Sequence, residues 1–346
     1  MAVLAVVTSS PPAIDGGHLV IARSLIIAAR ESGHDAHLVV TPDCQFGRQV
    51  SSYLATWRTP VRVVAGQKID QVISLRYPSY GVRHGVHVSW LNHTMREYYD
   101  LWPRFAGALS PRGRVRERAK RVAIRAVDRW LLTRNVTEVI AQSRTVQRRL
   151  AIDLGVTSDV LRPPPPQRAY RCERYGDYIF AVSRLTPLKR LDLVIRALAE
   201  PAACHVRAVI AGEGESRADL ERLSASRGVS DRVMWLGRVS DEALIEHLAR
   251  CRAVCFPPLG EDYGFVTVEA FASRKAVITC IDSGGPSELV RDGETGLVCD
   301  PTPEAMAAAL ARVTDDAAFA ERLGGAAARY ADTLTWSAAV KRLVIV

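Results

Sequence analysis

The chain has little of what marks exported, disulfide-stabilised or membrane-spanning proteins. Its 346 residues include seven cysteines, an odd number that argues against a disulfide framework. No apolar run approaches the roughly 18 residues that a helix needs to cross a bilayer. The apolar start at 3–7 follows no basic region and is stopped by Pro11 and Pro12, which predicts a buried first strand rather than a signal peptide. These absences favour a cytoplasmic protein with reduced cysteines.

The amino-acid composition is that of a globular protein with two domains. Hydrophobic residues make up 48% and charged residues 24% of the chain, which excludes a disordered polypeptide. The length suits two cores of roughly 150 residues each. Cys251 and Cys255 form a close pair without a companion pair of cysteines or histidines, so we expect them to pack in a core rather than bind zinc.

Short apolar strands alternate with amphipathic helices in both halves, the pattern of doubly wound parallel sheets. A run of four prolines at 163–166 interrupts the pattern and predicts a domain boundary. We therefore expect an N-terminal domain over 1–165, a linker over 166–177, a second domain over 178–325 and a C-terminal helix over 326–346 that crosses back to the first domain. The strands expected in the first half lie near 3–8, 36–41, 61–65, 71–75, 86–91, 137–141 and 158–162, and those in the second near 178–183, 206–211, 233–236, 253–257 and 276–280.

Residues that can hold an anion follow several of the expected strands, where ligands of such sheets bind. Gly16 and Gly17 stand between the first strand and the first helix, and bare backbone there lets amides approach a ligand. Arg184 follows strand 178–183 and Lys189 stands at the start of the next helix, so both cations reach one crevice. A plain turn and a solvated basic loop explain these two patterns equally well.

The segment 261–269 is the richest in chemistry. It places Glu261 in a loop and Glu269 in a helix that Gly264 opens, with the amides of Phe265, Val266 and Thr267 between the two acids. Carboxylates accept hydrogen bonds from sugar hydroxyls and helix-end amides hold phosphate oxygens, although glutamate near a helix start is also an ordinary response to the helix dipole. A second amide-rich turn, Gly284-Gly285-Pro286, follows strand 276–280. The turn at 212–214 lacks the third glycine of the dinucleotide fingerprint, which argues against NAD.

Together these elements resemble glycosyltransferase family 4. The resemblance covers nearly the whole chain, most strongly 178–300, and implies the GT-B fold: α/β, with two Rossmann-like doubly wound parallel-sheet domains facing a central cleft. The matching elements are Gly16-Gly17, Gly33-His34, Arg184-Leu185 with Lys189, 212–214, Leu236-Gly237, 261–269, 284–288 and 293–298.

The resemblance implies a retaining transfer of a hexosyl unit, with mannose favoured, from a nucleoside-diphosphate sugar to a hydroxyl of a glycan, glycolipid or small molecule. It implies no cofactor and no metal, and the chain contains no Asp-x-Asp pair of the kind that holds a metal-bound diphosphate. Arg184 and Lys189 then neutralise the leaving diphosphate, Glu261 orients the donor sugar and Glu269 holds the ribose. The amides from Gly264 to Thr267 and the 284–286 turn complete the donor site.

On the acceptor side the resemblance points to a histidine of the first domain. His93 follows strand 86–91 in an element, His93-Thr94-x-Arg96, similar to one in some hexosyl-transferring members of the family; His84 and His87 are rivals. Two positions depart from the family pattern, because Ser183 and Arg190 stand where glycines are usual, and Arg190 leaves the shape of that loop open. The alternative functions are a non-catalytic nucleotide-sugar-binding partner, a related synthase with a soluble acceptor and, more distantly, a dehydrogenase.

The net charge of +9 comes from one segment. Between 104 and 149 there are thirteen lysines and arginines and three acids, a local charge of +10. A helical pattern over 114–129 places Val115, Ala119, Val122 and Ala126 on one face, beside a stripe of arginines at 114, 118, 121, 125 and 129. The basic segment 112–149 could bind the inner, anionic face of a membrane, which suits a lipid-linked acceptor, or be a solvated surface; nucleic acid is the least favoured partner.

Overall fold

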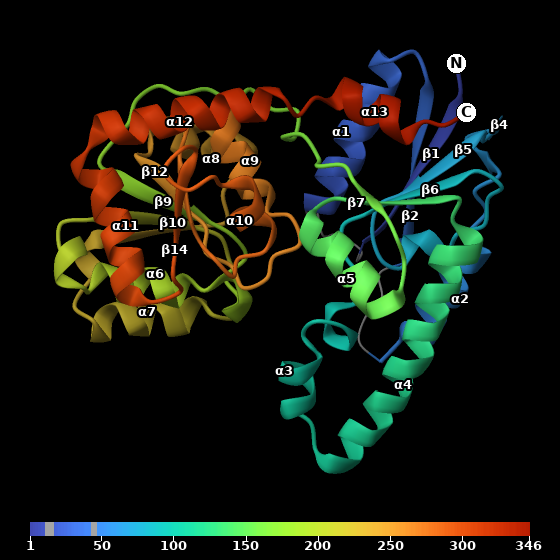
Figure 1. Ribbon diagram of the computed structural model, residues 1–346, viewed down its shortest axis with the longest axis horizontal. Coiled ribbons are helices and arrows are strands. Elements are labelled where there is room, and N and C mark those ends of the chain that lie inside the picture. The colour runs from blue at the N-terminus through green and yellow to red at the C-terminus, as the bar shows by residue number, and fades with distance from the viewer. Residues whose placement is uncertain (11–16, 43–46) are drawn as a thin grey trace. The chain divides into compact units, whose positions relative to one another are not determined.

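The computed structural model describes residues 1–10, 17–42 and 47–346, and Figure 1 shows its elements along the chain. It divides into two compact units: unit 1 is Met1–Pro166 with Thr335–Val346, and unit 2 is Gln167–Leu334. The first boundary falls directly after the four prolines. The chain therefore leaves unit 1 once and returns to it for its last twelve residues.

Unit 1 is built on a six-stranded parallel sheet in the order β2-β1-β5-β6-β7-β8. The order reverses between β1 and β5, which is the topological switch point of a doubly wound sheet. The stretch expected as strand 61–65 instead forms a small antiparallel hairpin, β3 with β4. The strands are β1 (Val3–Ser10), β2 (Asp35–Pro42), β3 (Val63–Val64), β4 (Gln67–Lys68), β5 (Gln71–Ser74), β6 (His87–Leu91), β7 (Glu138–Ala141) and β8 (Asp159–Val160).

The helices of unit 1 include one long basic helix, α4, which with α3 extends away from the sheet (Figure 1). Ser110 and Ser143 cap α4 and α5 by accepting hydrogen bonds from the backbone three residues on, at 3.2 and 3.1 Å. The helices are α1 (Gly17–Glu31), α2 (Gln49–Arg58), α3 (Trp102–Gly107), α4 (Pro111–Trp130), α5 (Arg144–Leu154) and α13 (Trp336–Leu343).

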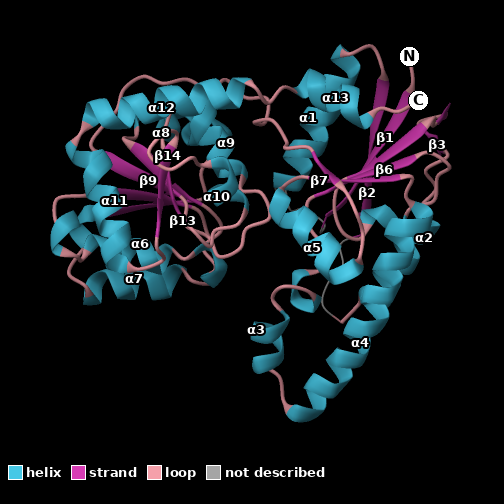
Figure 2. Cartoon of the chain, in the orientation of Figure 1, coloured by secondary structure: helices cyan, strands magenta, loops and turns pink. Residues whose placement is uncertain are grey.

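Unit 2 repeats the design with the parallel order β11-β10-β9-β12-β13-β14, and its order reverses between β9 and β12. Figure 2 shows the strands of this unit surrounded by helices. The strands are β9 (Tyr178–Val182), β10 (Arg207–Ala211), β11 (Val233–Gly237), β12 (Ala253–Cys255), β13 (Val277–Cys280) and β14 (Gly296–Cys299). The helices are α6 (Leu191–Leu198), α7 (Arg217–Ser226), α8 (Asp241–Arg250), α9 (Phe265–Ala272), α10 (Gly285–Leu289), α11 (Pro303–Asp315) and α12 (Ala317–Asp332).

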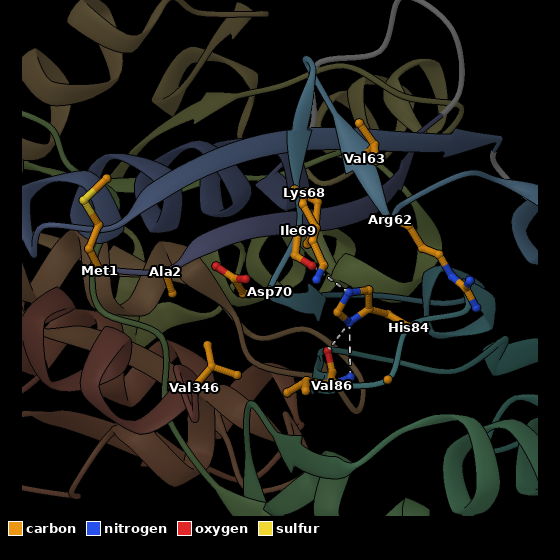
Figure 3. A pocket seen from close by; sticks show the side chains of 11 residues that line it. Met1, Ala2, Arg62, Val63, Lys68, Ile69, Asp70, His84, Val86 and Val346 are labelled. Carbon is orange, nitrogen blue, oxygen red and sulfur yellow. Dashed lines mark hydrogen bonds between the residues drawn. The ribbon is translucent and has the colours of Figure 1, made fainter.

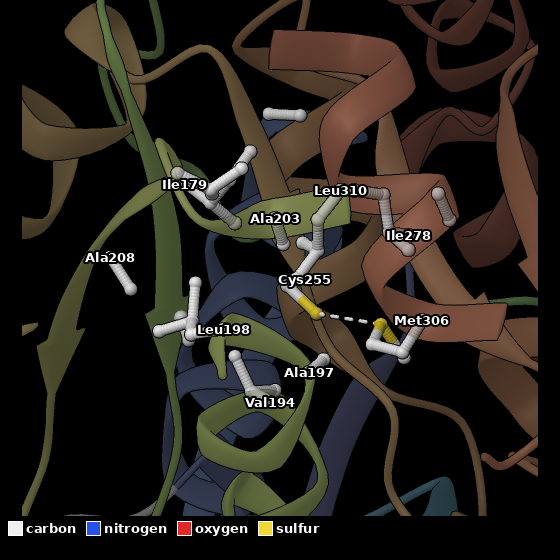
Figure 4. Close-up of a cluster of buried hydrophobic side chains, with 14 of the residues drawn as sticks. Ile179, Val194, Ala197, Leu198, Ala203, Ala208, Cys255, Ile278, Met306 and Leu310 are labelled. Atoms are coloured by element: carbon white, nitrogen blue, oxygen red, sulfur yellow. Dashed lines mark hydrogen bonds between the residues drawn. The ribbon is translucent and has the colours of Figure 1, made fainter. Parts of the chain in front are cut away.

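Two apolar clusters fill the two faces of the unit 2 sheet. One joins inward side chains of β9, β10 and β12 to α6 and α11, among them Ile179, Leu198 and Leu310 (Figure 4). The other packs Phe180 and Val254 against α8, α9 and α12. Cys255 lies in the first cluster with its Sγ 3.7 Å from Met306 Sδ, as expected of a packed thiol, and the six cysteines of the described ranges are all free.

The predicted pair of doubly wound parallel sheets is confirmed, whereas the chain's end differs from expectation. Instead of one helix over 326–346 there are two, α12 and α13, because Thr335 caps a new helix by accepting from Ala338 N at 3.3 Å. β14 was not expected as a strand at all. Over the residues that the structure describes, no helix is long and apolar enough to span a bilayer.

Candidate functional site

In unit 2 the candidate site lies at the switch point, where the loops after β9 and β12 leave neighbouring strands. Open parallel sheets bind ligands outside the carboxyl ends of their strands at this point, because the chain departs to opposite faces and leaves a crevice. The loop after β9 carries Arg184 and Lys189, and the loop after β12 carries Glu261. We call these three residues the switch-point cluster.

Lys189 and Glu261 form an ion pair across the two loops. Lys189 Nζ donates to Glu261 Oε2 at 2.6 Å, and each side chain keeps 20% of its surface exposed. Lys189 Nζ also lies 5.5 Å from the centre of the Phe256 ring. The pair therefore holds both groups in place while leaving both open to a ligand.

Arg184 differs from Lys189 in having no charge partner. Its side chain is exposed, and within 1–10, 17–42 and 47–346 it makes no hydrogen bond or ion pair. Its backbone is held by the turn, since Thr186 N donates to Arg184 O at 2.9 Å. An exposed guanidinium at the end of a central strand is available to bind an anion bidentately.

The shape of the loop at Arg190 has a clear physical explanation. Arg190 adopts the left-handed region with φ at 49°, a conformation that glycine occupies without strain. Its guanidinium compensates by donating twice to Asp282, at 2.8 and 2.6 Å, and to the carbonyls of Pro257 and Pro258 at 2.8 and 2.9 Å. Arg190 thus joins the loops after β9, β12 and β13 by hydrogen bonds, and its charge is paired with that of Asp282.

The glycines of the 212–214 turn are required by backbone packing. A Cβ atom on Gly212 would lie 1.8 Å from Ser183 O, and one on Gly214 2.3 Å from Leu185 O. Leu185 N donates to Glu213 O at 2.9 Å, so the turn runs against the loop that carries Arg184. These glycines therefore position the cluster rather than admit a ligand.

The 284–286 turn is joined to the Glu261 loop in the same way. Glu261 N donates to Ser283 O and Gly285 N donates to Glu261 O, both at 2.8 Å. A Cβ atom on Gly284 would lie 2.4 Å from Glu261 O, and one on Gly264 2.7 Å from Pro286 Cγ. The amide of Gly285 is therefore used in fixing Glu261, which differs from the ligand contact expected of it.

The backbone amides at the start of α9 are of two kinds: one closes the first turn of the helix, and others are open to a ligand. Thr267 N donates to Gly264 O at 2.9 Å, closing the first turn. Phe265 and Val266 begin the helix, where a backbone N–H has no acceptor within the helix itself. Of the amide cluster expected over 264–267, the amides of Phe265 and Val266 are therefore suited to an anion.

Glu269 is buried in α9 and bound by two residues that the sequence did not single out. Its Oε1 accepts from the Arg168 guanidinium and from Tyr170 OH at 3.1 Å. Arg168 also pairs with Asp241 of α8 at 2.7 Å. Burial raises the pKa of Glu269, and the charge of Arg168 opposes that rise. Arg168 and Tyr170 come from the stretch expected to be a linker.

In unit 1 the histidine candidates lie at opposite ends of β6. His93 follows the carboxyl end, half-buried, with its Nδ1 2.8 Å from Thr94 O. His87 is the first residue of the strand and is buried, with Nε2 2.9 Å from Ser74 Oγ, and burial lowers its pKa to about 3. His84 precedes the strand, with both ring nitrogens near backbone carbonyls. Only His93 of the three stands where ligands of parallel sheets bind.

The remaining glycines of the first loop are partly outside the described residues. Gly17 is the first residue of α1, and a Cβ there would meet nothing within 4 Å. Gly16 lies in 11–16, outside the ranges that the structure describes. The role expected for this pair stays a prediction.

A cavity of about 850 Å³ lies at the other edge of the unit 1 sheet (Figure 3). It is lined by the start of β1, by Ile69 and Asp70 before β5, and by His84 and Val86 before β6. Both ring nitrogens of His84 are already within hydrogen-bond distance of backbone carbonyls. The amino ends of parallel strands are not where such sheets bind substrates, so we do not assign the site there.

Comparison with known proteins gives a family match within unit 2. Residues 174–330 match the family described as Glycosyl transferases group 1. The chain is 35% identical over 170 residues to the alpha-D-kanosaminyltransferase of Streptomyces kanamyceticus, covering 47% of this chain and 44% of that protein. It is 33% identical over 201 residues to a D-inositol 3-phosphate glycosyltransferase of Streptomyces griseus, covering 53% and 42%. The chain thus spans about half the length of the curated relatives it matches.

Solved structures are similar over nearly the entire chain. Anabaena HepE in complex with UDP and glucose matches with a TM-score of 0.71 at 17% identity, covering 98% of this chain and 97% of that one. WaaG, a glycosyltransferase involved in lipopolysaccharide biosynthesis, matches with a TM-score of 0.73 at 15% identity, covering 99% and 100%. At this identity the likeness establishes the fold, which is GT-B with two Rossmann-like parallel-sheet domains.

Proposed function

We propose that this chain is a glycosyltransferase that moves a hexosyl unit from a nucleoside-diphosphate sugar to an acceptor hydroxyl. The observation that carries the proposal is the switch-point cluster: an unpaired arginine and a lysine–glutamate pair at the carboxyl ends of β9 and β12, within the segment that matches the glycosyl transferase family. Cations there suit a diphosphate, and a partly exposed carboxylate suits the hydroxyls of a sugar.

Each member of the cluster has a role that its contacts support. Arg184 and Lys189 neutralise the charge that grows on the leaving diphosphate as its bond to the sugar breaks. Glu261 accepts hydrogen bonds from the hydroxyls of the donor sugar while Lys189 fixes its carboxylate. The amides of Phe265 and Val266 add the partial positive charge of a helix start, and Ser183 stands beside the same crevice.

The nucleoside half of the donor is assigned to Glu269. Hydroxyls of a ribose donate to a carboxylate, and the charge of Arg168 favours the ionised form of Glu269 against burial, which raises the pKa of that carboxyl. Tyr170 and Arg168 orient the carboxylate for this contact.

The reaction proposed is a retaining transfer without a metal. The acceptor oxygen bonds to the anomeric carbon on the face from which the diphosphate departs, and its proton passes to a diphosphate oxygen. Arg184 and Lys189 supply the positive charge that a metal ion supplies elsewhere. A chelator is expected to leave turnover unchanged, and NMR of the product is expected to show the anomeric configuration of the donor. Loss of activity with chelator, restored by a divalent ion, would contradict metal independence.

The acceptor side is assigned to unit 1, with His93, after β6, as the side chain that contacts the acceptor. The acceptor class is a glycan, a lipid-linked molecule or a small molecule, and a role in glycan biosynthesis at the inner face of a membrane fits the basic segment 112–149. The relatives act on different molecules, since they include a GDP-mannose-dependent phosphatidylinositol monomannoside mannosyltransferase of Mycolicibacterium smegmatis, 32% identical over 55% of this chain and 53% of that protein.

The donor is tested by a thermal-shift panel of nucleoside diphosphates and nucleotide sugars. GDP-mannose is expected to stabilise the protein most, on the strength of the Glu261-Asp262-Tyr263-Gly264 and His93-Thr94-x-Arg96 elements. Stabilisation by NAD(P)H and by no nucleotide sugar would contradict the proposal.

The second candidate is a nucleotide-sugar-binding partner without catalysis, which the same donor site would also suit. Donor hydrolysis in the absence of acceptor separates the two. Slow release of free sugar, lost in the Glu261→Ala variant, is expected of the enzyme. Tight binding with neither hydrolysis nor transfer would favour the binding partner.

A further inference from the structure

Helix α4 of unit 1 shows the solvent an unusual set of side chains. Every exposed residue along its twenty positions is an arginine or is apolar: alanine, valine, tryptophan or proline. Val115 is 72% exposed, Val122 64%, Val127 42% and Trp130 50%. An ordinary solvated helix face mixes acids and uncharged polar residues among its basic ones. The exposed face of α4 carries neither acids nor uncharged polar residues.

The two acids of α4 are buried against unit 1. Asp128 accepts from Tyr80 OH and Tyr99 OH, both at 2.6 Å, and Glu117 accepts from Tyr98 OH at 2.6 Å. Both residues are at most 3% exposed. These contacts fix the rotation of the helix, so the composition of its outer face is a property of the fold.

The helical period groups the apolar residues of the outer face of α4. Val115, Ala119, Val122 and Ala126 follow one another at intervals of four, three and four, which places them in one stripe. At about 100° per residue this stripe points away from the buried Glu117, Ile124 and Asp128. Arg118 and Arg129 border it on one side and Arg116 on the other.

We infer that this outer face of α4 docks on an anionic lipid bilayer, with the valine–alanine stripe in the headgroup boundary and the arginines on lipid phosphates. An interfacial helix has this design, an apolar stripe bordered by cations. Charge complementarity selects the occupant, because a second copy of the same face would bring arginine against arginine. Nucleic acid would use the arginines but not the exposed valines, since apolar side chains gain nothing from a phosphate backbone.

The arginines divide into those held by the protein and those left for the surface. Arg121 donates to Tyr98 O at 2.7 Å, and Arg125 pairs with Asp153 at 3.1 Å, so both serve the fold. Arg112, Arg118 and Arg129 are exposed, and no hydrogen bond or ion pair joins their side chains to any other part of the chain that the structure describes. These three can be changed without disturbing the anchoring of α4.

The test is sedimentation of the full chain with vesicles of phosphatidylcholine alone or with about a third phosphatidylglycerol. Wild-type protein is expected to bind only the anionic vesicles and to be released by high salt. Each cation near the surface contributes about fivefold, so the triple variant R112Q/R118Q/R129Q is expected to bind on the order of 100-fold more weakly. The variant Val115→Ser with Val122→Ser is expected to lose at least about tenfold at unchanged charge.

A charge-matched control comes from three surface arginines of unit 2. The variant R196Q/R207Q/R222Q removes the same charge from side chains that are 41%, 67% and 78% exposed, and is expected to bind vesicles as the wild type does. Equal binding to neutral and anionic vesicles, or equal losses in both triple variants, would overturn the proposal. So would salt-sensitive binding of a labelled oligonucleotide without vesicle binding. No nucleotide sugar is present, so the result is independent of the glycosyl transfer proposed above.

Discussion

At the scale of single residues, the candidate site contains charged side chains that are fixed by a partner and still partly exposed to a ligand. Lys189 and Glu261 pair at 2.6 Å with a fifth of each side chain exposed, whereas the guanidinium of Arg190 donates to Asp282 and to two backbone carbonyls. Under the proposed function the three cations of this loop have different tasks. Arg184 and Lys189 would bind the donor diphosphate and Lys189 also orients Glu261, whereas Arg190 shapes the loop.

Glu261→Ala and Lys189→Ala are each expected to lower kcat/KM by at least about tenfold, roughly 1.4 kcal/mol of transition-state stabilisation. Under the proposed function, one variant loses the carboxylate that orients the donor sugar and the other loses the positive charge that neutralises the leaving diphosphate. Initial rates of transfer measure the effect, with Glu294→Ala as control, because Glu294 is 57% exposed and pairs only on the surface with Arg291. Wild-type rates in both site variants would refute the assignment.

Arg168→Met is expected to destabilise unit 2 by about 3–5 kcal/mol, because it leaves the buried Glu269 carboxylate without its cation. Arg171→Met in the same segment removes pairs with Glu173 and Glu246 from a side chain that is 45% exposed, so a loss of at most about 1 kcal/mol is expected. Urea unfolding of the two variants compares them directly. Equal losses would mean that the Arg168–Glu269 pair is not a buried one.

Asp128 makes the stability of unit 1 depend on pH. Burial among three tyrosines raises the pKa of its carboxyl from 3.8 to about 6. A carboxyl whose pKa is raised on folding stabilises the fold most when it is protonated, so this contribution is lost as the pH rises through about 6. Between about pH 5 and about pH 7 the wild type is expected to lose about 1.4 kcal/mol relative to Asp128→Asn, which stays neutral. Urea unfolding at both pH values measures the difference, and a constant gap would show that Asp128 does not ionise in this range.

At the scale of elements, glycines set how closely loops and helices approach. In α12 a Cβ on Gly324 would lie 2.1 Å from Arg274 O, whereas one on Gly325 would meet only arginine side chains at 3.8 and 3.9 Å. Substitutions at these two adjacent glycines therefore distinguish the effect of packing from the effect of helix propensity.

Gly324→Ala is expected to lower the free energy of unfolding by about 1–3 kcal/mol, because the new methyl group collides with a backbone carbonyl. Gly325→Ala is expected to raise it by about 0.5–1 kcal/mol, since alanine favours the helix over glycine. Thermal and urea unfolding check both. A loss in Gly325→Ala as large as that in Gly324→Ala would contradict the packing explanation.

Most strands and helices could be predicted because their apolar residues recur with the period of the element. β14 could not, because Gly296–Cys299 is a four-residue run within a glycine-rich stretch, and its partner strand alone makes it a strand. The segment 167–170 could not either, since Arg168 and Tyr170 reach Glu269 across about a hundred residues of sequence. Periodicity is local, whereas these contacts are not.

The same distinction between local sequence pattern and long-range contact applies to the candidate site. The meeting of Lys189 with Glu261 could be predicted, because residues directly after neighbouring parallel strands lie at one edge of the sheet, whereas the function of the two residues and of Arg184 stays a prediction. That Gly285 N binds Glu261 O, rather than standing free, depends on how two loops pack and has no signature in sequence. The same holds for Asp128 and Glu117, two acids in a basic helix that turn inward.

At the scale of the whole molecule, unit 1 is closed by the end of the chain. Leu343 is fully buried and its carbonyl accepts from Gln71 Nε2 at 2.6 Å, while Trp336 Nε1 donates to Pro165 O at 2.9 Å. Arg342 pairs with Glu138 and with Asp159 of the same unit. Helix α13 is therefore part of unit 1 in packing and in electrostatics.

Leu343→Ala is expected to destabilise unit 1 by about 2–5 kcal/mol, because it opens a cavity under α13. Hydrogen exchange followed by mass spectrometry is expected to show faster exchange in peptides of β1 and β5, and unchanged exchange in peptides of β9 and β12. Equal acceleration in both units would show that they unfold together.

The return of the chain to unit 1 has a consequence for its synthesis. All of unit 2, Gln167–Leu334, is made before the twelve residues that complete unit 1. On a ribosome the later domain can therefore reach its native state first, while the earlier one waits with the surface for α13 uncovered. Unit 2 can therefore fold before unit 1 is complete, the reverse of the usual order from the N-terminus.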